Sequence, residues 1–257
     1  MAKNLPATKP KTDVVNWTSM LKESAAKQAK ASESLAVSSV MVSFKGAILS
    51  IGGIQRRNNT ARVVVLCIMN ERAFYSGKYN PDEPRTPVCY AYGEVDGGLP
   101  EEPHEASTDK QSDACKGCPN AEWGTADVGR GQACKQSVKL ALVALPEGKP
   151  SAIDIDRLDI NFARIPPTSL KAVKVYLDWL GANGMATFST ITKLEVVPSS
   201  KSIFTVHLTP EEELPGAWHG AIAAKVKAAQ TAIDQPYPEF EERQPQQRQQ
   251  PTGKKRY

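Results

Sequence analysis

The sequence predicts a mixed α+β protein in which a β core is interrupted by a polar insertion and flanked by helices. Two apolar runs bounded by turn residues, 62–69 and 138–145, predict buried strands. The segment 80–136 between them has little apolar content and many turn residues, and it holds four of the five cysteines. After two prolines, segment 168–181 repeats apolar residues at helical spacing, which predicts the clearest helix of the chain.

The N-terminal part is predicted to contribute little to the core. Residues 1–13 are rich in Lys and Pro with almost no apolar content, so they are expected to be disordered. Residues 14–36 contain neither Gly nor Pro and carry one modest apolar stripe, which predicts a peripheral helix. The core domain is therefore expected to span 37–234, with a first strand over 43–51 and an inserted module over 89–134.

The C-terminal half is predicted to continue the α+β pattern. In the helix of 168–181 the apolar stripe comprises Leu170, Val173, Leu177 and Leu180. Segments 191–197 and 203–208, separated by a polar turn, predict a hairpin. Segment 209–213 predicts the capped start of a helix, and the sequence that follows is rich in Ala as far as residue 234. The Gln- and Pro-rich residues 235–257 are expected to be disordered.

Charge is distributed unevenly along the chain. Residues 1–62 carry 10 basic and 3 acidic side chains, whereas 89–134 carry 3 basic and 9 acidic ones. This asymmetry is compatible with a polyanion that meets one face only, and equally with solvated faces that bind nothing. No apolar stretch has the length of a membrane span and the N-terminus lacks an apolar signal region, so a cytoplasmic protein without membrane contact is expected.

Four cysteines form the sharpest signal in the sequence. Cys89, Cys115, Cys118 and Cys134 lie in the polar insertion, and Lys116 and Gly117 between the middle two predict a tight turn that aims two thiolates at one ion. A segment so poor in apolar residues cannot fold around its own core, whereas zinc held by four thiolates supplies folding free energy directly. One structural Zn²⁺ per chain is therefore expected, in a closed site without catalytic water.

Other interpretations of the cysteines remain open. A disulfide framework is disfavoured without an export signal, and a Cys-x-x-Cys redox pair lacks its usual βαβ setting. His104 lies in the same insertion and could replace Cys89 as the fourth ligand. The fifth cysteine, Cys67, falls inside a buried strand and is expected to be a small core residue.

Basic and aromatic side chains near the first strands suit a single-stranded nucleic acid. Aromatic rings offer bases a stacking surface, and Lys or Arg side chains track phosphates. The alternative is that Phe74 and Tyr75 pack beneath the insertion. The candidate contact residues are Lys45, Arg56, Arg57, Arg72, Phe74, Tyr75, Lys78 and Tyr79.

No catalytic constellation is evident. The sequence contains no Walker loop, His-Glu-x-x-His or Gly-x-Ser-x-Gly motif, and His207 and His219 have no nucleophile nearby in sequence. Asp154, Asp156 and Asp159 resemble a metal-ion nuclease cluster, but they alternate with apolar residues and are expected on the wet face of strands. A non-enzymatic protein is therefore expected.

Several stretches resemble a family of tailed-bacteriophage proteins with a four-cysteine zinc module. They are 44–49, 73–81 with 87–91, 115–124, 129–134 and 166–171. The layout is similar to phage single-stranded-DNA-binding proteins that carry a zinc insertion in an OB-fold. The resemblance implies an α+β fold with a partly open, OB-like β-barrel core, an inserted zinc-ribbon-like module and peripheral helices.

Two features depart from those phage proteins. One zinc ligand there is a His where Cys89 stands here, and the acidic C-terminal tail is replaced by one that ends in Lys254, Lys255 and Arg256. The expected function is non-enzymatic binding of single-stranded DNA, or RNA, in phage replication or recombination, with phage or host replication proteins as further partners. The alternative is a zinc-stabilised protein–protein adaptor or transcription regulator that acts on a host enzyme.

Overall fold

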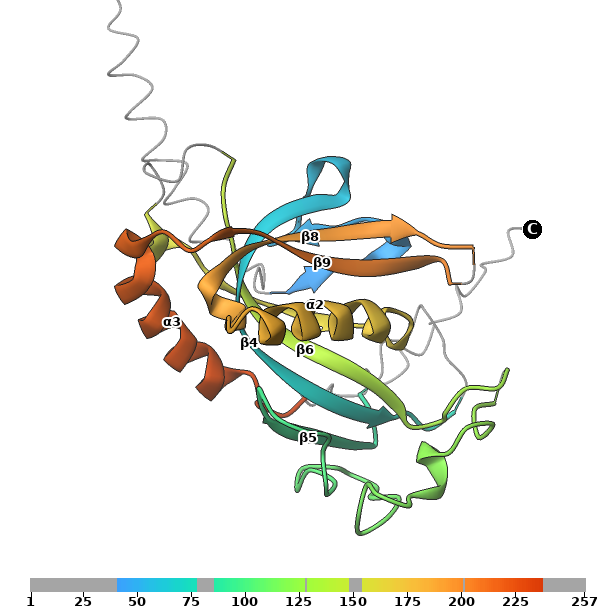
Figure 1. The fold of residues 1–257 in the computed structure, drawn as a ribbon. Coiled ribbons are helices and arrows are strands. Elements are labelled where there is room, and N and C mark those ends of the chain that lie inside the picture. The colour runs from blue at the N-terminus through green and yellow to red at the C-terminus, as the bar shows by residue number, and fades with distance from the viewer. Residues whose placement is uncertain (1–40, 78–85, 128, 148–153, 201, 238–257) are drawn as a thin grey trace, which may run out of the picture. The chain divides into compact units, whose positions relative to one another are not determined.

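A sheet of six antiparallel strands forms the centre of the protein (Figure 1). The computed structural model describes residues 41–77, 86–127, 129–147, 154–200 and 202–237, which belong to one compact unit. In the sheet the strand order is β7-β6-β4-β8-β9, and β5 pairs with the second half of β4. The strands are β4 (Thr60–Phe74), β5 (Cys89–Val95), β6 (Lys135–Ala144), β7 (Ile160–Ile165), β8 (Thr190–Pro198) and β9 (Phe204–Glu213).

A small second sheet precedes the central one. It consists of β1 (Val42–Ser43), β2 (Ser50–Ile51) and β3 (Ile54–Gln55), paired in sequence order. A 3-10 turn, Lys45–Ala47, interrupts the segment that the sequence predicts as one strand over 43–51. Gly46 and Ala47 both have positive φ there, which a continuous strand cannot accommodate.

The long strand β4 changes the face of its side chains at a β-bulge. Before the bulge, Val63 and Val65 pack into one core, while Val64 and Leu66 pack into the other. The register then shifts between Val65 and Cys67 because one extra residue is inserted. Beyond the bulge the pattern is reversed. The odd-numbered residues now face the core that contains Val64 and Leu66, and the even-numbered residues face the core that contains Val63 and Val65.

Two helices cover the two faces of the sheet. Helix α2 (Leu170–Ala182) buries Val173, Tyr176 and Leu180 in the first core, together with residues of the small sheet. Helix α3 (His219–Ala232) buries Ile222, Val226 and Ala229 in the second core, which also holds Cys67. Both predicted strands and the helix after Pro167 are present (Figure 1). The burial of the two strands and the core position of Cys67 are also confirmed.

The sheet is open and does not close into a barrel. β7 and β9 are the two ends of the strand order and do not pair with one another. The structure is thus mixed α+β with mostly antiparallel sheets, as the sequence predicts at the level of fold class. The predicted N-terminal helix over 14–36 and the predicted disordered residues 1–13 lie outside the described residues.

Two further sequence predictions need correction, at 209–213 and at 155–157. Segment 209–213 is not a helix entrance but the end of β9, where it pairs with the start of β8, and the helix begins only at His219. The first residues of segment 89–134, which is predicted as an insertion in the core domain, form β5 and pair with β4. Residues 155–157 form a 3-10 turn rather than a strand, although Asp154, Asp156 and Asp159 are exposed as predicted.

In the described part of the chain, neither helix has the length and apolar character needed to cross a membrane.

Candidate functional site

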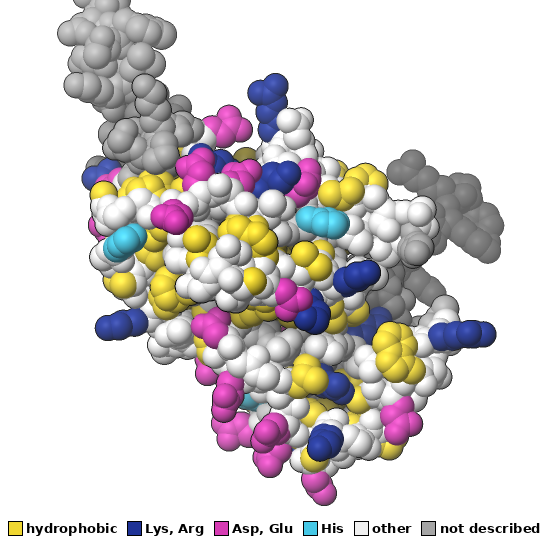
Figure 2. Space-filling view, viewed as in Figure 1, with side chains coloured by type: hydrophobic (Ala, Val, Ile, Leu, Met, Phe, Trp, Pro, Cys, Tyr) yellow, Lys and Arg dark blue, Asp and Glu magenta, His cyan; other side chains and the backbone are white. Residues whose placement is uncertain are grey.

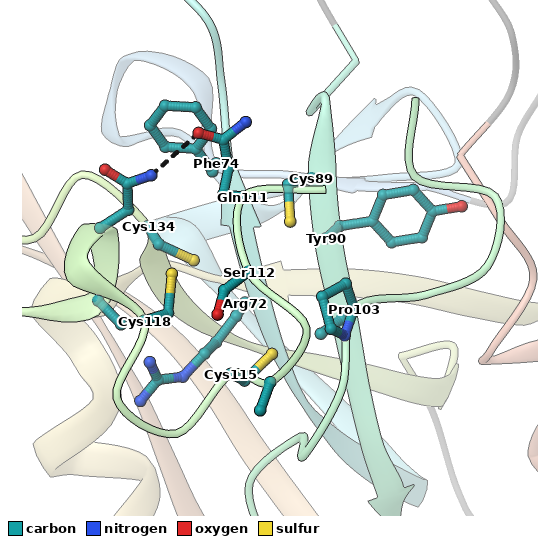
Figure 3. A pocket seen from close by; sticks show the side chains of 14 residues that line it. Arg72, Phe74, Cys89, Tyr90, Pro103, Gln111, Ser112, Cys115, Cys118 and Cys134 are labelled. Carbon is teal, nitrogen blue, oxygen red and sulfur yellow. Dashed lines mark hydrogen bonds between the residues drawn. The ribbon is translucent and has the colours of Figure 1, made fainter. Parts of the chain in front are cut away.

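A cavity at the end of β4 brings the four cysteines of the insertion together. It lies between β4 and β5 on one side and the loop that joins β5 to β6 on the other (Figure 3). Its enclosed space of about 20 Å³ accommodates one water-sized sphere. The side chains that line it include Cys89, Cys115, Cys118, Cys134, Arg72 and Phe74.

Backbone hydrogen bonds hold the loop over the cavity. The Cys115 amide donates to the Glu101 carbonyl at 2.7 Å, and the Cys134 amide donates to the Asn120 carbonyl at 2.6 Å. The Asn120 side chain also donates to the Gln111 side chain at 3.1 Å, the bond drawn dashed in Figure 3. The loop has no apolar core, so these polar contacts are what positions its thiols.

A glycine makes the turn between the two closely spaced cysteines possible. Gly117 has a φ of 79°, in the left-handed region that other residues reach only with strain. The chain therefore reverses within Cys115–Cys118, and both side chains meet the same cavity. This confirms the tight turn expected from the spacing of the two cysteines.

The electrostatics of the cavity oppose free thiolates. Burial raises the pKa of Cys134 to about 12 and also raises that of Cys115, while the Arg72 guanidinium acts in the opposite direction on both. Each further thiolate among the four raises these pKa values again. Without a cation the thiols of Cys115 and Cys134 are consequently protonated at neutral pH, and a bound metal would favour their deprotonation.

The sulfurs surround a common space without converging on one point. All five cysteines of the chain are free thiols in the structure. In the part of the chain that the structure describes, no three His, Cys, Asp or Glu side chains are arranged to hold a metal ion. The donor set suits zinc, which takes four thiolates, but binding would require the side chains to move inward.

His104 is directed away from the cysteines. Its ring stacks on Tyr90 with centroids 4.9 Å apart, and its Nδ1 accepts a hydrogen bond from the Ala106 amide at 3.1 Å. Cys89, by contrast, lines the cavity. Of the two candidates for a fourth ligand, the geometry favours Cys89.

The predicted stacking platform is divided between the two faces of the sheet. Phe74 lines the cysteine cavity, whereas the neighbouring Tyr75 lies on the opposite face, where its hydroxyl accepts a hydrogen bond from Arg164 at 2.7 Å. Arg72 also lines the cysteine cavity, so it is not grouped with the other predicted phosphate contacts. Lys78 and Tyr79 lie outside the described residues.

Lys45, Arg56 and Arg57 belong to one loop system at the small sheet. Asn59 ties its parts together, since its side chain accepts from the Leu49 amide at 3.2 Å and donates to the Ala47 carbonyl at 3.1 Å. Lys45 and Arg57 are exposed, and Arg56 lines an open hollow of about 500 Å³ with its neighbours. The Arg56 Nε atom is buried without a hydrogen-bond partner.

A buried polar network on the opposite face was not predicted from the sequence. Glu71, 1% exposed at its side chain, pairs with the Arg164 Nε at 2.6 Å and accepts a hydrogen bond from Ser137 at 2.7 Å. The Tyr237 hydroxyl donates to the other carboxylate oxygen of Glu71. A single Glu within the long apolar strand was the available signal, but its partners are distant in sequence.

The pKa shifts in this network follow from burial and from the Glu71 carboxylate. Burial and Glu71 together raise the pKa of Tyr237 above its usual value. For Arg164, burial acts to lower the pKa, but Glu71 outweighs it and the pKa is raised. The guanidinium and the phenol therefore keep their protons, and Tyr237 ties the start of the predicted disordered tail to the sheet.

The cysteine loop also has an acidic, partly apolar outer surface. Acidic side chains gather on the lower part of the face shown in Figure 2, over the loops that follow β5. Trp123 in this loop is 79% exposed, the second-highest value among the exposed large apolar residues. Such an exposed ring in a loop rich in acidic residues offers an apolar anchor.

Comparisons of the chain with protein-family models, with curated proteins and with solved structures find no significant match.

Proposed function

We propose that this protein binds single-stranded nucleic acid, without enzymatic activity, and that a structural zinc ion organises its cysteine loop. The observation that carries the proposal is the meeting of four cysteines, from Cys89 to Cys134, around one small cavity. Cysteines scattered through a surface loop for no purpose would not be expected to line the same space.

The zinc ion would supply the cohesion that the loop lacks. Cys89 is presented by β5, and the other three ligands come from the loop and its return to β6. Zinc would therefore link the loop to the rigid sheet. The ion closes its coordination with four thiolates, which leaves no position for a reactive water, and this supports a structural role.

The nucleic acid is proposed to contact the loop system at the small sheet. Arg56 and Arg57 line an open hollow there, and Lys45 is exposed in the same loop system. Asn58 and Asn59 have positive φ, which turns the backbone around that hollow. Basic side chains on a rigid turn suit phosphates, whereas the acidic cysteine loop repels them.

The single-stranded nucleic acid is proposed to run past the end of the β-sheet rather than across either of its faces. Helices α2 and α3 cover the two faces of the central sheet, so neither face is open to bases. The proposal keeps the predicted partly open, OB-like barrel with a zinc module. In this proposal the curved antiparallel sheet is the barrel, and the insertion is the zinc module. DNA is the first polymer to test, with RNA as the alternative.

Salt-dependent binding to a labelled oligo(dT) tests the proposal. We expect binding at low salt. The slope of the logarithm of the binding constant against the logarithm of the salt concentration should become shallower by about 1.4 when Arg56→Gln and Arg57→Gln are combined, which is about 0.7 per lost phosphate contact. Arg130→Gln, an exposed arginine in the acidic loop, is the matched control and should leave the slope unchanged. Absence of binding by the wild-type protein at low salt would refute nucleic-acid binding.

A second candidate is a zinc-stabilised adaptor that docks a partner protein on the cysteine loop. The exposure of Trp123 within an acidic loop favours it, because buried aromatic anchors dominate many protein interfaces. The oligo(dT) measurement separates the candidates: an adaptor retains its zinc but shows no salt-dependent affinity for single strands.

A further inference from the structure

Arg72 is a cationic residue near the end of β4 that lines the cysteine cavity. Its Nε atom is buried and makes no hydrogen bond. No carboxylate pairs with it among the described residues, and the side chain lines the cysteine cavity (Figure 3). Leaving a guanidinium N–H buried and unpaired is costly, so such a position calls for an acceptor that the structure does not include.

The four cysteines are the groups placed to accept these hydrogen bonds. A neutral thiol is a weak acceptor, whereas a thiolate forms a charge-assisted hydrogen bond with an arginine. Zn²⁺ bound by four thiolates carries a net charge of −2. A buried centre with that charge is favoured by a nearby cation, and Arg72 is the arginine that lines the cavity.

The sheet holds Arg72 at this place. Arg72 pairs with Ala91 on β5, and two residues further along β4, Phe74 pairs with Cys89. Paired residues lie on the same face of an antiparallel sheet, so Arg72 and Cys89 share a face and a rigid support. The side chain thus reaches the cavity from a strand, not from the loop that carries the other cysteines.

We propose that Arg72 is the charge partner of the metal centre: its guanidinium donates N–H···S hydrogen bonds to the zinc-bound thiolates and offsets part of their negative charge. The inference rests on the proposed zinc site and assigns it a residue that is not a ligand. It also replaces the sequence-based prediction that Arg72 contacts phosphate. Arg72 is a positioning residue, acting on the metal through the sulfurs.

Cobalt binding to the full-length protein tests this assignment. Co²⁺ replaces zinc in thiolate sites and reports the sulfurs through their charge-transfer absorption, and competition with Zn²⁺ then measures both affinities. Partners that orient metal ligands typically contribute a factor of about 10–100 in metal affinity. We expect Arg72→Met to lower affinity by that factor and to move the charge-transfer band to longer wavelength, because the sulfurs lose their hydrogen bonds.

Conservative variants separate the role of Arg72 from a general effect on folding. Arg72→Lys keeps the charge and should recover much of the affinity, and Arg72→Gln keeps two N–H donors without the charge and should recover less. Arg130→Gln removes an exposed arginine from the same loop and should change affinity by less than about twofold. If Arg72→Met does not fold, the metal affinities of the Lys and Gln variants are compared with that of the wild-type protein and test the same assignment.

Three outcomes would overturn the inference. Wild-type protein that binds neither Zn²⁺ nor Co²⁺ would remove the proposed metal centre and this assignment together. Wild-type affinity and an unshifted absorption band in folded Arg72 variants would remove the assignment alone. Unchanged metal affinity with a smaller salt slope for oligo(dT) would return Arg72 to the predicted phosphate contact.

Discussion

Glu71 and Arg72 are neighbours on β4, and their charged side chains have different surroundings because they lie on opposite faces of the sheet. Glu71 faces Arg164, Ser137 and Tyr237, which together satisfy its carboxylate. Arg72 faces four cysteines, and its buried Nε atom has no hydrogen-bond partner. The charge on the first face is paired within the chain, whereas the second face carries the cysteines of the proposed zinc site.

The comparison distinguishes a charged residue that stabilises the fold from a charged residue that belongs to a proposed binding site. A buried charge whose partners all lie within the chain stabilises one arrangement of that chain. Arg72 is half-buried beside four cysteines, and its unpartnered Nε atom instead supports the proposal that this site receives a metal ion. The following experiments disturb each face in turn, beginning with the largest expected effect.

Removal of metal should affect only the cysteine face. A strong chelator, or Cys118→Ser, is expected to release about one zinc per chain and to expose the cysteine loop to protease, since structural zinc contributes about 10–16 kcal/mol of binding free energy in small domains. β5 should stay ordered because it pairs with β4. Metal analysis and limited proteolysis measure the effect.

Cys67→Ala is the control for this experiment and should retain the metal, because Cys67 lies in the second core. A protein without zinc, whose four loop cysteines all react freely in the native state, would contradict the prediction.

Glu71→Ala should destabilise the whole sheet. It leaves the Arg164 guanidinium without its carboxylate, and breaking a buried pair in this way costs about 3–5 kcal/mol. We expect a loss near 3 kcal/mol, because the Arg164 side chain is 33% exposed and solvent screens part of the effect. Urea denaturation measures the free energy of unfolding.

The matched control is Glu94→Ala, which removes an exposed carboxylate from β5 and should change stability by less than about 0.5 kcal/mol. Equal losses in the two variants would mean that the Glu71 network contributes nothing specific.

Tyr237→Phe should have a smaller effect on the same face. It removes one hydrogen bond to the Glu71 carboxylate while keeping the ring near Tyr90 and Arg164. Hydrogen bonds to charged groups contribute about 1.5–3 kcal/mol, and we expect the lower end because Tyr237 is half-buried. Hydrogen exchange at 233–237 should accelerate, and unchanged exchange would show that the tail start is held by other contacts.

Trp123→Ala should have the smallest effect on stability, below about 0.5 kcal/mol, because its side chain is already 79% exposed. Thermal unfolding of the zinc-loaded protein checks this. A larger loss would show that the ring packs within the loop and would weaken the adaptor candidate.

Local patterns in the sequence predicted the elements whose signal is repeated over many residues. The buried strands, the helix that became α2 and the hairpin of β8 and β9 each show a period of two or about 3.6, which follows from backbone geometry alone. The shared cavity of the four cysteines was likewise anticipated from their spacing in a segment without an apolar core. The segment 209–213 was assigned to a helix because Pro followed by acidic residues often begins one, but pairing with β8 decided otherwise.

Only the tertiary structure decided which charged residue faces which site. Simple alternation from Val63 along β4 would place Glu71 on the face of the first core and Arg72 on that of the second, and the bulge at Leu66 and Cys67 reverses this. A bulge depends on pairing with β6, which is distant in sequence, so it leaves no local pattern. The sequence by itself thus determined which residue types are available, including the four cysteines of the proposed zinc site, whereas long-range pairing decided that Arg72, and not Glu71, faces them.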